Sequence, residues 1–116
     1  MSGPATACSV EVIAADLSML THRQALVGLL NAYAQDPMGG GWPLTDEVKR
    51  HLPDALARRV GVHVLLAQQG EQFVGLLIAM EGFSTFACKP LLNIHDIVVL
   101  PAFRQRGIAG RLLART

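Results

Sequence analysis

Residues 92–113 read LNIHDIVVLPAFRQRGIAGRLL, an apolar run followed by a proline link and a glycine-containing turn. The apolar run over 91–100 predicts a strand that is buried on both faces. Pro101 ends this strand, and apolar residues at helical spacing predict a helix from about Gly107. A buried strand that passes through a short turn into a helix is typical of a mixed α/β domain.

The turn between this strand and this helix predicts a site for a phosphate group. Its main-chain N–H groups lie at the positive end of the helix. The small residues Gly107, Ala109 and Gly110 leave room for a ligand to approach the backbone. Arg104 and Arg106 add positive charge, and arginine binds phosphate through paired hydrogen bonds. The alternative interpretation is an ordinary helix start with solvated arginines.

The segments before this strand predict first a strand and then a helix. The strand covers 9–14, and the helix starts at Leu17 or Thr21 and ends at Ala34. Thr21 and Gln24 have the spacing of a capping box, so Thr21 is the expected N-cap.

A loop over 36–43 follows, with three consecutive glycines and the only tryptophan of the chain. Thr45 then caps a second helix, which Pro53 is expected to divide. Asp46 and Arg50 are spaced to form an ion pair on its surface.

Two further strands, 60–68 and 72–80, form a hairpin around the turn 69–71. The second is apolar on both faces, which predicts a central strand covered on both sides. The order of elements is therefore β-α-α-β-β-β-α, an α/β (α+β) arrangement in one domain over residues 1–116.

The composition excludes several classes of protein. Hydrophobic residues make up 51% and charged residues 16%, which excludes a disordered chain. Ten Lys and Arg against nine Asp and Glu give a net charge of +1, too small to recruit nucleic acid. No apolar run approaches the ~20 residues of a membrane span, and no secretory signal is visible. We expect neither nucleic acid nor membrane as a partner.

The cysteines and the histidines on predicted helices do not indicate a catalytic or metal-binding role. Cys8 and Cys88 are far apart and form no metal-ligand pattern, so no metal is expected. Two thiols without a signal sequence indicate a reduced, cytoplasmic protein. His22 and His51 lie on predicted helices and are expected to be solvated.

Residues 92–113 resemble motif A of the GNAT N-acetyltransferases. That motif is a hydrophobic strand, a short proline-aromatic link and the pattern Arg/Gln-x-x-Gly-x-Gly/Ala, and Arg104, Gly107 and Ala109 stand at the matching positions. Segment 82–90 is similar to the diamine and thialysine acetyltransferase branch. The resemblance implies the GNAT fold, with a mixed, mostly antiparallel sheet flanked by helices.

The resemblance also implies acetyl-CoA as co-substrate. Ile97, Val98 and Val99 match strand positions whose backbone groups hydrogen-bond the pantetheine arm. The turn that holds the pyrophosphate is opened by Arg104 and continued by Gln105, Arg106, Gly107, Ile108, Ala109 and Gly110.

The implied reaction is acetyl transfer to a primary amine of a small molecule, by direct attack in a ternary complex. His95 stands where the branch usually has Glu, so it is the expected catalytic base; a structural histidine is the alternative. Asp96 matches an acidic position that either contacts the amine or orders a loop. The other residues expected in the acceptor pocket are Asp36, Trp42, Phe83 and Ser84. For Asp36 and Trp42, an ordinary connecting loop with a packed tryptophan is an equally good interpretation.

Members of this family continue past the motif A helix with further strands and a helix, so the resemblance implies an incomplete domain. The strand over 91–100 is then expected to have an open edge, and such edges pair with other chains. A truncated gene product, a homodimer formed by edge pairing or exchange, and a bound partner are the alternatives. A non-catalytic acetyl-CoA-binding remnant or regulatory protein of the same fold is the alternative function.

Overall fold

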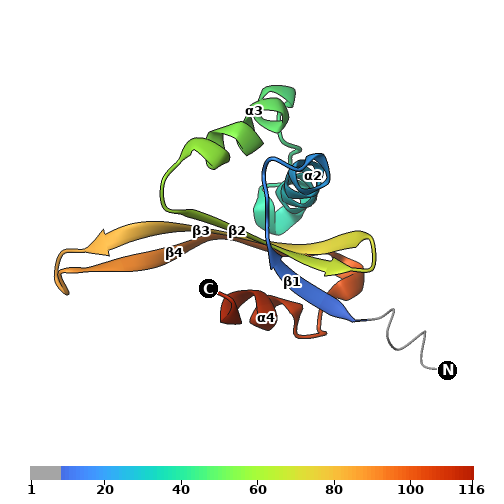
Figure 1. Ribbon diagram of the computed structural model, residues 1–116. Helices are drawn as coiled ribbons and strands as arrows, with labels where there is room; N and C mark the ends of the chain where they lie inside the picture. The colour runs from blue at the N-terminus through green and yellow to red at the C-terminus, as the bar shows by residue number, and fades with distance from the viewer. Residues whose placement is uncertain (1–8) are drawn as a thin grey trace.

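The computed structural model describes residues 9–116. Its sheet has four strands in the order β1-β2-β3-β4, and neighbouring strands are antiparallel. Two helices cover one face of the sheet and a third covers the other (Figure 1). This confirms the predicted order β-α-α-β-β-β-α. The elements are β1 (Val10–Ala14), α2 (Leu20–Gln35), α3 (Asp46–Arg58), β2 (Val62–Gln69), β3 (Gln72–Ser84), β4 (Lys89–Val99) and α4 (Ile108–Ala114).

Two apolar clusters hold the layers together. Ile108 and Leu112 of α4 belong to the cluster on one face of the sheet, and Leu26 and Leu29 of α2 belong to the cluster on the other. Strand residues contribute to the two clusters alternately, because successive side chains point to opposite faces. Residues 74–79 of β3 are all buried, which confirms that β3 is a central strand covered on both sides.

Gly75 sets how closely α4 approaches the sheet. A Cβ atom at Gly75 would lie 3.1 Å from Ala67 Cβ and 3.3 Å from side-chain atoms of Ile108 and Leu112. Because Gly75 has no side chain, α4 and the turn that precedes it can lie against the first residues of β3.

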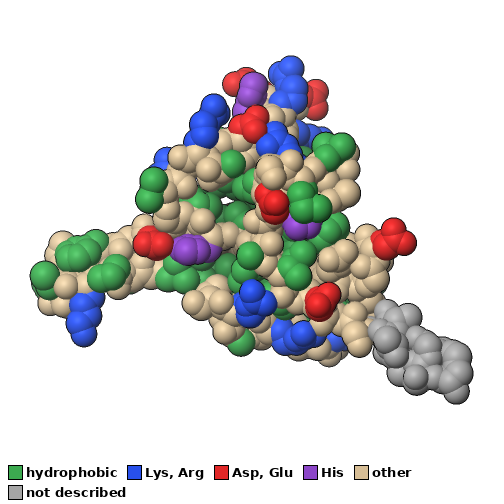
Figure 2. Space-filling model, viewed as in Figure 1, with side chains coloured by type: hydrophobic (Ala, Val, Ile, Leu, Met, Phe, Trp, Pro, Cys, Tyr) green, Lys and Arg blue, Asp and Glu red, His purple; other side chains and the backbone are tan. Residues whose placement is uncertain are grey.

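β4 differs from the predicted strand that is buried on both faces. Residues 89–95 are exposed, and only Val98 is buried. The reason is that the distal halves of β3 and β4 extend beyond the helices on both sides as a two-stranded arm, here called the β3–β4 arm (residues 80–94) (Figure 1). Hydrophobic side chains lie on its surface (Figure 2), and Phe83 is 59% exposed. No strand in residues 9–116 pairs with the outer edge of β4, which is the open edge expected.

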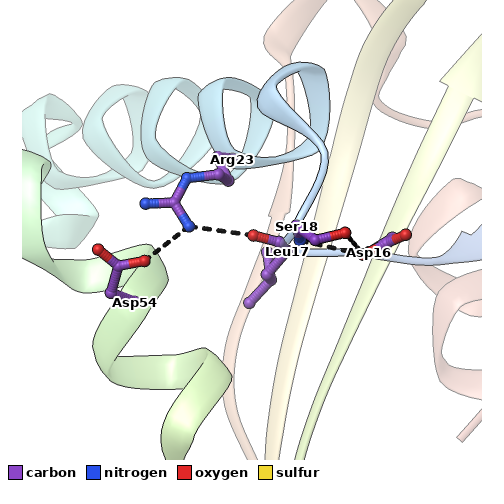
Figure 3. Close-up of polar contacts among 5 residues, drawn as sticks. All are labelled: Asp16, Leu17, Ser18, Arg23 and Asp54. Carbon is purple, nitrogen blue, oxygen red and sulfur yellow. Dashed lines mark hydrogen bonds and ion pairs between the residues drawn. The ribbon is translucent and has the colours of Figure 1, made fainter.

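The start of α2 corrects a prediction. The N-cap is Met19, which makes no side-chain cap, so the expected capping box with Thr21 as N-cap is wrong. A turn at Asp16 positions the chain for an earlier start: the Ser18 N–H and hydroxyl both donate to Asp16 Oδ1, at 3.0 and 2.6 Å (Figure 3). The Met19 N–H donates to the Asp16 carbonyl at 2.9 Å.

α3 confirms one prediction and corrects two. Thr45 caps it, because its Oγ1 accepts a hydrogen bond from the Val48 N–H at 3.2 Å. Pro53 does not divide the helix; it lies inside an unbroken helix, where burial of its ring offsets the hydrogen bond it cannot donate. Asp46 and Arg50 are not paired in the described chain, since holding two exposed side chains together gains little free energy.

His22 is buried, not solvated as expected. It is 8% exposed, and its Nδ1 accepts a hydrogen bond from the Asp16 N–H at 2.8 Å. The ring meets Phe73 edge-on, with centroids 5.5 Å apart. His22 is therefore a satisfied core histidine that fixes the β1–α2 connection.

Candidate functional site

The turn between β4 and α4 has an unusual backbone. Gln105 and Gly107 both adopt the left-handed conformation, with φ of 64° and 78°. Turns of this kind direct successive N–H groups to one side and bind anions. Gly107 is also the N-cap of α4, so the first N–H groups of the helix are not bonded within it.

The two glycines of the turn leave open space. A Cβ atom at Gly107 or at Gly110 would meet no atom within 4 Å. Packing therefore does not require glycine at either position, although the positive φ favours it at Gly107. Ala109 is exposed beside them, whereas the Ile108 side chain lies in the core. Only the main-chain N–H of Ile108 is available for the role predicted for it.

Two arginines flank this turn, and each has a defined contact. Arg104 Nε donates to the Val99 carbonyl at 3.1 Å, which ties the turn to the end of β4. Its Nη2 lies 3.6 Å from Asp36 Oδ2. The Arg106 guanidinium lies 5.2 Å from the ring centroid of Phe103, a cation–π contact.

Asp36 organises the loop that follows α2. Its carbonyl accepts hydrogen bonds from the N–H groups of Gly39 and Gly41, at 2.8 and 3.1 Å. Its own N–H donates to the Tyr33 carbonyl at 3.1 Å. The backbone thus places the Asp36 carboxylate beside the turn at residues 104–110. Trp42 lies in the same loop and is 80% exposed, so it is not a packed tryptophan.

The strand residues expected to contact a pantetheine arm have their side chains in the protein interior. Ile97 and Val99 pack against the α4 cluster, and Val98 belongs to the cluster on the other face. What β4 can offer a ligand here is main chain, because an edge strand has N–H and C=O groups that no neighbouring strand uses.

His95 lies at a β-bulge. Asp96 pairs with Ile78 of β3. The next pair joins Ile94 to Ala79, so His95 is an extra residue without a partner on β3. Bulges redirect side chains and are frequent beside active sites. The bulge depends on pairing with another strand, which explains why residues 91–100 alone did not indicate it.

Asp96 faces the side of the sheet covered by α2 and α3, because its partner Ile78 belongs to that cluster. The carboxyl is partly buried, and this burial raises its pKa, while the charge of His95 acts in the opposite direction. A carboxyl with a raised pKa is suited to accept a proton during a reaction.

The predicted acceptor residues do not form one group. Phe83 and Ser84 lie at the far end of the β3–β4 arm, whereas Gly75 pairs with Val99 beside the turn. At ~3.3 Å per residue, residues 75 and 84 are about 30 Å apart along the strand. The structure places Asp36 beside the turn at residues 104–110, whereas Phe83 and Ser84 lie far from it.

The remaining titratable side chains of residues 9–116 form no potential metal site. No three His, Cys, Asp or Glu side chains in residues 9–116 gather so that they could hold a metal ion. His63 and Glu81 form an exposed pair, with Nε2 and Oε2 2.8 Å apart. Cys88 is exposed in the turn of the arm, and Cys8 lies outside the described residues. None of the helices described is long and apolar enough to cross a membrane.

Comparison with known proteins gives a family match. Residues 24–116 match the family described as Acetyltransferase (GNAT) family. No curated protein sequence matches the chain.

Several solved structures share the fold. A ribosomal-protein-alanine N-acetyltransferase from Brucella melitensis biovar Abortus 2308 superposes with a TM-score of 0.70 at 19% identity, over 92% of this chain and 68% of that one. The aminoglycoside acetyltransferase meta-AAC0020 from an uncultured soil metagenomic sample, in complex with sisomicin, gives 0.71 at 21%, over 91% and 66%. AAC(6')-Iy, in complex with a bisubstrate analogue of CoA and acetylneamine, gives 0.71 at 20%, over 92% and 68%. These likenesses confirm the fold, and the chain spans about two thirds of the length of each structure.

Proposed function

Since the chain belongs to the GNAT family of acetyltransferases, we propose that it transfers the acetyl group of acetyl-CoA to a primary amine of a small molecule. The observation that carries this proposal is the turn before α4, with left-handed Gln105 and Gly107 and open space over Gly107 and Gly110. A diphosphate needs such converging N–H groups and such room.

The residues present fit acetyl-CoA. The main-chain N–H groups from Gln105 to Gly110 would hold the pyrophosphate, and the Arg104 and Arg106 guanidinium groups would add charge-assisted hydrogen bonds. The main chain of Ile97, Val98 and Val99 would hydrogen-bond the pantetheine arm along the outer edge of β4.

The chemistry needs a proton acceptor close to the amine. Acetyl-CoA would supply a thioester: the amine nitrogen would form a C–N bond to the carbonyl carbon, the C–S bond would break, and CoA would leave as the thiolate. His95, at the bulge of β4, would take the proton from the amine, and the neighbouring Asp96 carboxyl is the alternative proton acceptor. Burial of Asp96 supports this role because it raises the pKa of the carboxyl.

For the acceptor, we propose the loop beside the phosphate turn. The Asp36 carboxylate would attract a cationic amine, and the exposed ring of Trp42 would stack on it. Phe83 and Ser84 are too distant to join them. The match to the diamine and thialysine branch, which rests on segment 82–90, therefore says less about the acceptor than the loop does.

A thiol-release assay with acetyl-CoA tests this proposal. The amine panel contains a diamine, thialysine, an aminoglycoside and a peptide with a free N-terminus. We expect release above the background for at least one small amine, and loss of that release in His95→Gln or Asp96→Asn. Binding of acetyl-CoA without turnover on any amine would support the alternative, a non-catalytic acetyl-CoA-binding protein.

We also propose that the chain forms a homodimer through the outer edge of the arm part of β4 (residues 91–94), which leaves the edge at residues 97–99 to the pantetheine arm. Two observations support this: no described strand pairs with that edge, and Leu91, Leu92 and Ile94 are partly exposed along it. Light scattering should give twice the chain mass, and Ile94→Lys should give a monomer. Val60→Lys is the matched control, because Val60 is fully exposed outside the strand. A monomer at all concentrations would contradict the proposal.

A further inference from the structure

A groove of about 460 Å³ lies between α2 and α3. Residues 23–31 of α2 form one wall, and residues 49–53 of α3 form the other. Leu26 and Leu29 pack toward the sheet, so at 100° per residue the groove lies on the opposite side of α2. It is therefore separate from the phosphate turn and from the bulge at His95.

Gly28 forms part of this groove. A Cβ atom there would meet nothing within 4 Å, so no neighbour requires glycine at this position. Glycine inside a helix is destabilising relative to alanine, because it loses more backbone freedom on folding. What Gly28 provides is open space along the α2 wall of the groove.

Arg23 connects α2 to α3 at one end of the groove. Its Nη1 lies 2.8 Å from Asp54 Oδ1 on α3 and donates to the Leu17 carbonyl at 3.0 Å (Figure 3). The hydrogen bond from Arg23 lowers the pKa of the Asp54 carboxyl, so this pair stays charged and links the two helices. The charge of Arg23 is thus already matched.

The remaining charges of the groove are positive and unmatched. Lys49 and Arg50 line it, and neither side chain has an ion pair or hydrogen bond within residues 9–116. No carboxylate lines the groove. Lys49 is partly buried.

Asn31 adds a further donor. Its Oδ1 accepts a hydrogen bond from the Leu44 N–H at 2.8 Å, so its acceptor is occupied and its NH2 group remains. Two cations and an amide NH2 on one groove complement an anion. Val27 and Pro53 supply apolar surface beside Gly28, which complements an apolar body.

We propose that this groove binds a small carboxylate with an apolar body, at a site distinct from the acetyl-transfer site. Its length favours a small molecule over a long peptide, because residues 23–31 of a helix span only about 12 Å. The proposal goes beyond the acetyltransferase function and does not depend on it.

A titration followed by backbone amide NMR tests the proposal, with phenylacetate as the probe and neutral phenylacetamide as its uncharged match. We expect phenylacetate to shift the amides of residues 23–31 and 49–53, and to bind at least tenfold more tightly than phenylacetamide. Equal affinity, or shifts confined to the turn at 104–110, would overturn it. An acidic hexapeptide that binds more tightly than phenylacetate would overturn the choice of a small molecule.

Variants make the test specific. Lys49→Gln should weaken phenylacetate binding at least fivefold, and Lys89→Gln, the matched lysine on the arm, should leave it unchanged. Gly28→Leu fills the groove with a good helix former, so it should fold and lose binding. Unchanged binding in Lys49→Gln or in Gly28→Leu would contradict the site, whatever the acetyl-transfer assay shows.

Discussion

The carboxylate of Asp36 lies 3.6 Å from the guanidinium of Arg104. This ion pair joins the loop after α2 to the turn after β4, which are far apart in the sequence. The side chain of Arg104 is 51% exposed, so a ligand can reach it. An anion bound at the turn would therefore compete with Asp36 for the same guanidinium group, and this one contact would couple the proposed cofactor and acceptor sites.

Replacing the arginine should affect mainly the cofactor. We expect Arg104→Gln to raise KM for acetyl-CoA about tenfold, the equivalent of ~1.4 kcal/mol, because a charge-assisted hydrogen bond to phosphate is lost. Steady-state kinetics measure this. Arg58→Gln, an arginine at the end of α3, is the control and should leave KM unchanged.

Replacing the aspartate should have opposite effects on the two substrates. Asp36→Asn removes the competitor for Arg104, so we expect a lower KM for acetyl-CoA. It also removes the charge that attracts the amine, so KM for the amine should rise. If both KM values moved in the same direction, Asp36 would not connect the two sites.

Asp96 should show a pH-dependent stability effect. Its pKa is raised above the ordinary value of 3.8, chiefly by burial. The folded state therefore binds the protonated form better, and stability is lost as the pH rises through the folded pKa. We expect Asp96→Asn to raise Tm at pH 7 and to give a smaller difference below pH 3.8. Thermal unfolding at both pH values measures this, and the same difference at both would contradict it.

Two glycines should respond oppositely to alanine. Gly75→Ala places a methyl group 3.1 Å from Ala67 Cβ and against α4, so we expect a loss of ~1–3 kcal/mol in the free energy of unfolding. Gly110→Ala meets open space in a helix, so we expect a gain of roughly 0.5–1 kcal/mol. Denaturant unfolding compares them, and an equal effect at both positions would show that α4 does not pack as described.

Local signals predicted the elements and the turn. The apolar pattern located the strands, Thr45 marked the start of α3, and Gly107 marked the start of α4, because each of these depends on neighbours in sequence. Thr21 matched a capping box, yet the turn at Asp16 determines where α2 begins.

Contacts between distant segments could not be predicted in the same way. The bulge at His95 exists only in the pairing with β3, and the exposure of the β3–β4 arm depends on where the helices end. The Asp36–Arg104 pair requires the fold to be complete, and so does the burial of His22 against Phe73. The sequence therefore predicted the turn before α4, but not the bulge and the ion pair that surround it.

Calorimetric titration of acetyl-CoA into the parent chain and into Gly107→Glu tests the central claim, that the turn before α4 holds the cofactor. The new carboxylate would stand in the open space where a diphosphate is expected. Gly70→Glu is the matched control, since Gly70 also has a positive φ and open space, but in the turn between β2 and β3. We expect the parent and Gly70→Glu to bind acetyl-CoA and a folded Gly107→Glu to lose binding. Equal binding by all three would contradict the account.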